Sequence, residues 1–138
     1  MAEFERLTDI FEVTAERLAE DLFGPRPLIE ALLAERDGAA VGYAIFHGTY
    51  STFRGRPGLY LEDIYVRGDA RGTGAGLRLL AEVAAIARAR GCHQVSWAVL
   101  DWNQSAIDFY ERLGARPSAG DWLSYAVTGE ALDRLAST

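Results

Sequence analysis

The chain has 138 residues, 49% of them hydrophobic, and a formal net charge of −6. This length suits one compact domain with a real core, spanning residues 1–138. The acidic balance argues against a protein that binds nucleic acid through its phosphates, and is compatible with cationic partners. The chain has one cysteine, Cys92, which excludes an internal disulfide. Since the chain has only two histidines, His47 and His93, we expect no metal site. Without an apolar run of 18 residues or a signal peptide, the protein is expected in the cytoplasm and off the membrane.

The first third of the chain predicts one helix and one hairpin. "TAERLAEDLFG", residues 14–24, has Thr14 as a typical N-cap and Gly24 as a stop. Two apolar runs then flank Asp37-Gly38, a dipeptide typical of tight hairpin turns. We therefore expect a short helix followed by two antiparallel strands.

The next segment predicts a loop and a third strand. "TYSTFRGRPG", residues 49–58, has the composition of a loop, and "LYLEDIYV", residues 59–66, that of a strand. Side chains alternate along a strand, so the expected faces are Leu61, Asp63 and Tyr65 on one side and Glu62, Ile64 and Val66 on the other. The adjacent acids would then point to opposite faces of the sheet.

The remaining elements alternate between helix and strand. A helix is expected over residues 77–90, a fourth strand over 94–100, a second helix over 105–115 and a last strand over 122–127. In the helix over residues 105–115 the apolar residues recur at the spacing of a buried face: Ala106, Phe109, Tyr110 and Leu113. A helix between strands three and four implies a parallel pair with a crossover, joined to an antiparallel meander, and hence an α/β fold.

A glycine-rich loop, "RGTGAG" at residues 71–76, separates the third strand from the next helix. It fits neither of two better-known phosphate loops, because the dinucleotide fingerprint needs glycine where Leu77 stands and the Walker loop ends in Gly-Lys-Ser/Thr. What remains is Arg-x-x-Gly-x-Gly. Glycines tolerate positive φ and expose bare backbone, and the free N–H groups of a helix N-terminus favour a phosphate or pyrophosphate. A strand-to-helix turn without a ligand is the alternative.

Two segments resemble the GCN5-related N-acetyltransferases: "LEDIYVRGDARGTGAG", which a helix follows, and "WAVLDWNQSAIDFYERLGA". More narrowly, "GRPGLYLED" and "VLDWN…AIDFYERLGA" are similar to the branch that acetylates diamines and thialysine. The resemblance extends over residues 5–130. It implies a single-domain, mixed and partly splayed β-sheet with flanking helices, acetyl-CoA as cofactor, and transfer of an acetyl group to a primary amine.

The chain departs from that family at its start. The family's first strand and most of its first helix have no counterpart in "MAEFERL", so the N-terminal strand is expected to be missing. A missing strand would leave a sheet edge exposed, and an exposed edge favours pairing with a second copy. We therefore expect a homodimer.

In this family the Arg-x-x-Gly-x-Gly loop holds the CoA pyrophosphate through successive backbone N–H groups. The resemblance implies cofactor contacts from Ile64, Tyr65, Val66, Arg71, Gly72, Thr73, Gly74, Ala75, Gly76, Asn103 and Tyr110. A main-chain N–H near Tyr65 or Val66 would polarise the thioester carbonyl. Arg67 and Arg78 either reach a phosphate or are solvated surface residues. Asn103 either binds the pantetheine arm or caps the following helix, and the two roles are compatible.

The resemblance also implies how the proton of the amine is handled. An alkyl ammonium has a pKa of roughly 10.4, so a base must take its proton near neutral pH. Glu62 is implied as that base through water and Asp63 as a neighbour of the cationic substrate, with solvent exposure as the alternative for one of them. Neither histidine is well placed by sequence for this task. Tyr110 is implied as the acid that protonates the CoA thiolate, with an ordinary core tyrosine as the alternative.

The expected substrate is a small primary amine such as a diamine, a polyamine or a thialysine-like compound. Phe53 and Tyr60 are expected to contact its carbon chain beside Glu62 and Asp63, although core packing suits Tyr60 equally well. Two alternatives stay open: an N-acetyltransferase of proteins or peptides with the same cofactor site, and a non-catalytic acyl-CoA-binding regulatory domain.

Overall fold

A computed structural model describes residues 12–118, 120 and 122–138 of the chain. They fall into two compact units, the first ending at Leu100 and the second beginning at Asp101. The first unit holds the sheet and the second holds two helices, and each is described by itself. The expected α/β class is confirmed, whereas the expected loss of an N-terminal strand concerns residues 1–11, outside the described residues.

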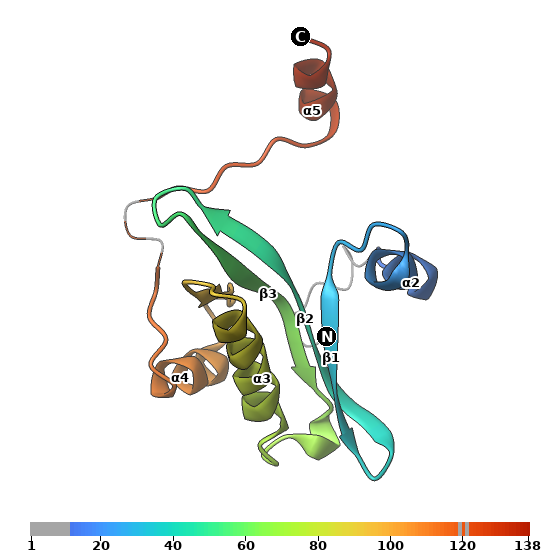
Figure 1. The fold of residues 1–138 in the computed structure, drawn as a ribbon, viewed down its shortest axis with the longest axis vertical. Coiled ribbons are helices and arrows are strands. Elements are labelled where there is room, and N and C mark those ends of the chain that lie inside the picture. The colour runs from blue at the N-terminus through green and yellow to red at the C-terminus, as the bar shows by residue number, and fades with distance from the viewer. Residues whose placement is uncertain (1–11, 119, 121) are drawn as a thin grey trace. The chain divides into compact units, whose positions relative to one another are not determined.

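The first described helix, α2 (Ala15–Phe23), forms where the sequence predicts it. The Thr14 hydroxyl accepts a hydrogen bond of 3.1 Å from the N–H of Arg17, which satisfies one free donor of the first turn. At the other end the N–H of Gly24 donates to the carbonyl of Glu20, and the chain leaves the helix. The helix lies on the β1 side of the sheet (Figure 1).

Four strands form one mixed sheet in the order β1 (Glu30–Arg36), β2 (Ala39–Ser51), β3 (Arg56–Val66) and β4 (Val95–Ser96). The first three are antiparallel and β4 runs parallel to β3, as expected from the crossover. Asp37 and Gly38 both have left-handed backbone angles, with φ of 53° and 80°, and join β1 to β2 in the predicted tight turn.

Helix α3 (Ala75–Ala89) covers one face of this sheet and makes the core (Figure 1). The buried apolar side chains are Val41, Ala44 and Phe46 of β2, Leu59 and Leu61 of β3, Ala70, and Leu79, Leu80, Val83 and Ala87 of α3. Burial of each large side chain stabilises the fold by about 1.5–3 kcal/mol. The core therefore fixes the strand that carries the predicted acids against the helix that follows the glycine loop.

Strand β3 contains a β-bulge that the sequence did not predict. Phe46 pairs with Leu61 and the adjacent Ile45 pairs with Asp63, so Glu62 is an extra residue without a partner in the register. Leu61 is buried with the core, whereas the Glu62 carboxylate contacts His47 on the opposite face. Asp63 faces the same way as its partner Ile45. The expectation that Glu62 and Asp63 point to opposite faces is therefore wrong, because the extra residue resets the alternation.

Two predicted boundaries also change. The expected loop over residues 49–58 is mostly strand, because β2 continues to Ser51 and β3 begins at Arg56, with a short turn between them. The expected fourth strand over residues 94–100 is paired only at Val95 and Ser96. Beyond this short contact the two parallel strands separate, which confirms the expected splay.

The second unit contains α4 (Gln104–Arg112), which confirms the predicted helix, and α5 (Gly129–Ala136), which was not predicted. Residues 122–127 form no strand, so the expected last strand is wrong for this part of the chain. A strand exists only when its backbone pairs with a neighbour, and local composition does not supply one. Within the described residues, no helix is long and apolar enough to span a bilayer.

Candidate functional site

The glycine loop connects the end of β3 to the start of α3. A short 3₁₀ turn, η2 (Gly68–Ala70), follows Val66, and the chain then turns through Arg71 to Gly74. Gly72 and Gly74 take φ of 79° and 87°, which L side chains rarely adopt, and Gly74 is the N-cap of α3. The loop thus needs glycine at these two positions for its own conformation.

The N-terminus of α3 is open toward this loop. Among the described residues, none accepts a hydrogen bond from the N–H groups of Ala75, Gly76 or Leu77, and the first donor with a partner is Arg78, which bonds to the Gly74 carbonyl at 3.0 Å. A Cβ built on Gly74 would meet nothing within 4 Å, and one on Gly76 only Val66 Cγ2 at 3.8 Å. Free donors beside open space fit an anion such as a pyrophosphate.

Side chains of the loop hold it against β3. The Arg71 Nε–H donates to the Val66 carbonyl at 3.0 Å, and its guanidinium lies 5.6 Å from the centre of the Tyr65 ring. The Thr73 hydroxyl donates to the Ala70 carbonyl. Arg71 therefore orders the loop, and its predicted contact with the cofactor stays a prediction.

The two arginines with open roles differ in their surroundings. Arg67 forms a two-point ion pair with Asp69, with N–O distances of 2.6 and 3.1 Å, and this hydrogen bonding lowers the pKa of the Asp69 carboxyl and raises the pKa of Arg67. Its guanidinium is thus already engaged by a carboxylate. Arg78 is exposed on α3, in a groove that Thr73 and Ala75 also line.

In the described chain, the last residues of β3 have no strand beside them on the β4 side, directly before this loop. Only Leu59 and Tyr60 pair with β4, so among the described residues no strand lies beside residues 61–66 on that edge. The predicted cofactor residues Ile64, Tyr65 and Val66 belong to this stretch, and all three are half-buried. These three residues end the strand directly before the glycine loop, and a polarising N–H group among them stays a prediction.

The face opposite α3 carries the two predicted acids together with a histidine. Oε2 of Glu62 lies 3.4 Å from Nε2 of His47, and the His47 ring stands 5.4 Å from the ring of Tyr60. The sequence alone placed no histidine here, whereas the structure brings His47 next to Glu62. The signal that finds it is the strand register, in which His47 pairs with Tyr60, two residues before Glu62. That register is not visible in the letters alone.

An apolar pocket adjoins this cluster on the β2 side. It is lined by Leu22 and Phe23 of α2, Pro27, Leu28 and Ile29 of the following segment, Glu30 and Ala31 of β1, and His47 and Gly48 of β2. Phe53, by contrast, is 90% exposed in the β2–β3 turn, nine positions before Glu62 along the chain. The first unit therefore gathers Tyr60, Glu62 and Asp63 but leaves Phe53 apart from them.

Asn103 and Tyr110 belong to the second unit. The Asn103 Oδ1 accepts from the Ala106 N–H at 3.4 Å, which confirms the alternative of a helix N-cap. Tyr110 is half-buried on α4, and its ring lies 5.5 Å from that of Phe109. No residue of α4 is fully buried, so the predicted stripe covers a partly exposed face. The cofactor roles of both residues stay predictions.

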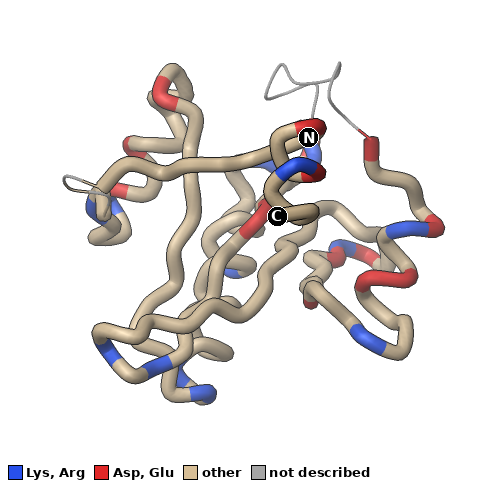
Figure 2. The backbone as a smooth tube through the Cα atoms, turned by 90° about the horizontal axis from the view of Figure 1, so that it is seen from above, with Lys and Arg blue, Asp and Glu red and all other residues tan. Residues whose placement is uncertain are grey.

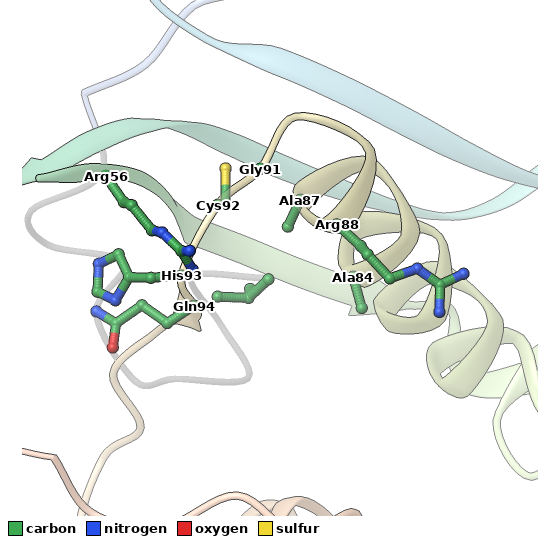
Figure 3. A pocket seen from close by; sticks show the side chains of 9 residues that line it. Arg56, Ala84, Ala87, Arg88, Gly91, Cys92, His93 and Gln94 are labelled. Carbon is green, nitrogen blue, oxygen red and sulfur yellow. The ribbon is translucent and has the colours of Figure 1, made fainter. Parts of the chain in front are cut away.

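A second pocket lies at the C-terminal end of α3 and contains none of the predicted site residues (Figure 3). Arg56 points toward the loop that carries Cys92 and His93, whereas Arg88 points away from that loop. Cys92 is a free, half-buried thiol. In residues 12–118, 120 and 122–138, no group of three His, Cys, Asp or Glu is arranged to hold a metal ion.

The acidic residues outnumber the basic ones by 20 to 14. Figure 2 shows them spread over several segments of the described chain. The acids of β3 are thus part of a generally acidic molecule, whose charge favours the approach of cations.

Comparison with known proteins gives a consistent result. Residues 2–115 match the family model described as the Acetyltransferase (GNAT) family. A thialysine N-epsilon-acetyltransferase from Sus scrofa is 41% identical over 146 residues, covering 99% of this chain and 85% of that protein. An L-ornithine N5-acetyltransferase from Arabidopsis thaliana is 31% identical, covering 98% and 78%. Among solved structures, an integron cassette protein from V. cholerae has a TM-score of 0.79 at 26% identity, covering 99% and 86%.

Proposed function

Because the chain belongs to the GNAT family of acetyltransferases, we propose that it transfers an acetyl group from acetyl-CoA to the primary amine of a small cationic molecule. The resemblance expected from the sequence is confirmed, and the chain is an acyl-CoA-dependent N-acyltransferase. The proposed acceptor is a diamine, a polyamine or a thialysine-like compound. All of these carry a primary amine at the end of a flexible aliphatic chain.

The open N-terminus of α3 supports acetyl-CoA as the donor. Three N–H groups without an acceptor among the described residues lie at the head of a 15-residue helix, next to two glycines in left-handed conformation. Such a set binds the pyrophosphate of CoA without any cationic side chain. The unpaired edge of β3 then provides main-chain groups for the pantetheine arm, as strand pairing would.

The side chains on the sheet face opposite α3 support a cationic acceptor. Glu62 and Asp63 lie on the same face, and the Glu62 side chain is 56% exposed, so it is accessible to an incoming ammonium group. The adjoining apolar pocket suits the aliphatic chain of the acceptor. This acidic-plus-apolar pair of features matches an alkyl amine better than a neutral or anionic acceptor.

We propose a direct transfer. Glu62 receives the ammonium proton through water, and the freed amine nitrogen attacks the thioester carbonyl carbon. A β3 main-chain N–H stabilises the developing oxyanion. The C–S bond then breaks, the Tyr110 hydroxyl protonates the CoA thiolate, and the second proton of the nitrogen returns through solvent to the Tyr110 oxygen. Asp63 attracts the charged amine before it reacts.

A single observation carries this proposal: the β-bulge places Glu62 and Asp63 on one face, within the stretch of β3 that has no described partner on its β4 side and that leads to the glycine loop. The test is thiol release from acetyl-CoA by the wild-type protein with thialysine, ornithine, diamines, spermidine and a peptide with a free N-terminus. We expect the small amines to react at least 100-fold faster than the peptide. Faster reaction of the peptide would favour the protein acetyltransferase, and acetyl-CoA binding without thiol release would favour the regulatory domain.

A further inference from the structure

We propose that His47 is a proton relay for Glu62, which passes the proton of the acceptor amine from the carboxylate to solvent. This inference rests on the proposed function, because it needs an ammonium group that reacts at Glu62. His47 does not touch the reacting atoms in this scheme and acts only through the carboxylate.

The contacts of the His47 ring support the relay. Its Nδ1 lies 3.3 Å from the Gly48 carbonyl oxygen, and its Nε2 lies 3.4 Å from Oε2 of Glu62. Both ring nitrogens therefore face oxygen acceptors. A neutral imidazole carries one N–H and donates to only one of them, whereas an imidazolium donates to both. Each ring nitrogen thus has an oxygen within 3.4 Å, so the ring can receive a proton from the Glu62 side.

The relay also answers a chemical need of the reaction. A carboxylate alone is a weak base near neutral pH, whereas imidazole is the side chain that takes up and releases protons between pH 5 and 8. The proton moves from the ammonium through water to Glu62 and then to Nε2 of His47, and no other bond changes. The His47 side chain is 34% exposed, so it returns the proton to water before the next turnover.

The other groups around His47 leave Glu62 as its closest acidic partner among the described residues. On β3 it faces Glu62 and Tyr60, with Asp63 one residue further along. On β1 the nearest acid is Glu30, whose carboxylate is held by Arg90 at 2.7 Å. From α2 and the segment after it, the pocket beside His47 is lined by apolar side chains.

The experiment is a double-mutant cycle read across pH. Wild type, His47→Gln, Glu62→Gln and the double variant are assayed for kcat/KM between about pH 6 and 10 with a small primary amine. Glutamine keeps a hydrogen-bonding side chain of similar reach but does not titrate in this range. The matched control is His93→Gln, which removes the other histidine of the chain, in the pocket at the end of α3.

We expect His47→Gln to lower kcat/KM about tenfold near pH 7 and to approach wild type near pH 10, where free amine is abundant. In the Glu62→Gln background, His47→Gln should lower kcat/KM no further, because Glu62 no longer delivers a proton to His47. His93→Gln should follow the wild-type profile. Melting temperature and acetyl-CoA affinity, measured on every variant, report the fold, and His47→Asn is the second variant if His47→Gln does not fold.

Three results would overturn the relay: an unchanged profile in His47→Gln, a loss that is equal at every pH, or losses that add independently in the double variant. The first two would assign His47 to the surface or to packing against Tyr60. Wild-type protein that releases no thiol with any amine would instead overturn the proposed function, and the relay with it.

Discussion

Glu62 and Asp63 are neighbours in sequence with different expected tasks, and the bulge places both on the same face of the sheet. Glu62 contacts the titratable ring of His47, whereas Asp63 pairs with Ile45, one step closer to the glycine loop. A proton acceptor and an electrostatic attractor respond differently to pH. The two residues are therefore separable by matched amide substitutions.

For Glu62→Gln we expect kcat to fall about 100-fold near pH 7 and to recover partly toward pH 10, because free amine no longer needs a base. Asp63→Asn should instead raise KM for the cationic amine at all pH values with a smaller effect on kcat. Steady-state kinetics over this range distinguish the two. A pH-independent loss in Glu62→Gln would reassign that carboxylate to substrate binding.

For Tyr110→Phe we expect a drop in kcat of about 100-fold or more, with little change in acetyl-CoA affinity or melting temperature. The ring and its contact with Phe109 remain, and only the donor hydroxyl is removed. Kinetics and thermal unfolding are measured on the same preparation. Full turnover combined with a lower melting temperature would identify Tyr110 as a structural tyrosine that has lost a hydrogen bond.

At the scale of elements, the junction of β3, the glycine loop and α3 forms the candidate cofactor site. Arg71 ties the loop to Val66 and Tyr65, and α3 presents its first N–H groups over open space. Gly74 has a left-handed backbone, so any larger residue there strains the chain itself. Gly76 has helical geometry, and a Cβ there would meet only Val66 Cγ2 at 3.8 Å, so the protein itself does not require glycine at this position.

Gly76→Ala is therefore the clean test of the cradle. The added methyl meets only Val66 Cγ2 at 3.8 Å, and alanine exceeds glycine in helix propensity by up to about 1 kcal/mol, so the melting temperature should stay level or rise. The Kd for acetyl-CoA should weaken at least tenfold, as measured by calorimetry. Gly68→Ala, whose Cβ meets nothing within 4 Å, is the control that should bind normally. Equal affinity in both variants would contradict the cradle.

Local signals predicted the elements that are fixed by local chemistry. Thr14 and Gly24 mark the ends of α2, Asp37-Gly38 marks the hairpin, and the glycine loop precedes α3 as expected. The bulge at Glu62 was out of reach because no residue in "YLEDIY" marks an insertion, and only the pairing with β2 reveals an extra residue. His47 was missed for the same reason, since its neighbour lies on another strand.

The predicted strand over residues 122–127 shows the converse limit. "WLSYAV" has the apolar and aromatic composition of a strand, yet these residues are not paired in the described chain. Composition measures how well a segment suits a pleated surface, whereas pairing depends on a neighbour that the segment does not encode. The same limit applies to the candidate site. The glycine loop is a local feature and was predicted, whereas the contact between His47 and Glu62 depends on strand pairing and was not.

At the scale of the whole molecule, the Glu30–Arg90 ion pair ties β1 to the residue that follows α3. Both N–O distances are 2.7 Å, and hydrogen bonding to Arg90 lowers the pKa of the Glu30 carboxyl below its usual 4.5. A depressed folded-state pKa means that the pair stabilises the protein above about pH 4.5 and that this contribution is lost as the pH falls through the folded value.

We therefore expect Glu30→Gln to reduce the free energy of unfolding near pH 6 and to have a smaller effect near pH 3. Denaturant unfolding at both pH values measures the difference. Glu82→Gln, which removes the same charge from an exposed position on α3, should be nearly silent at both. A Glu30→Gln effect that is equal at the two pH values would show that the pair acts by packing.

The expected homodimer is a further prediction at this scale. In the described residues β1 is the outer strand of the sheet, and Leu33 on it is 63% exposed. Such an edge is a template for pairing with a second copy. Sedimentation equilibrium should give twice the mass of the 15.1 kDa chain, and Leu33→Lys should shift the equilibrium toward monomer. A monomer at all concentrations would refute the prediction.

The bulge on β3 also determines how the protein tolerates insertions and deletions. Glu62 is the one residue of β3 whose excision would leave the cross-strand pairs Phe46–Leu61 and Ile45–Asp63 unchanged and close the ladder between them. We expect a chain that lacks Glu62 to fold with a melting temperature at or above that of wild type and to lose its transferase activity. Excision of Ile64 would turn the following side chains inside out and should prevent folding. Glu62 thus occupies a position that the fold does not require, and its presence interrupts the hydrogen-bond ladder between β2 and β3.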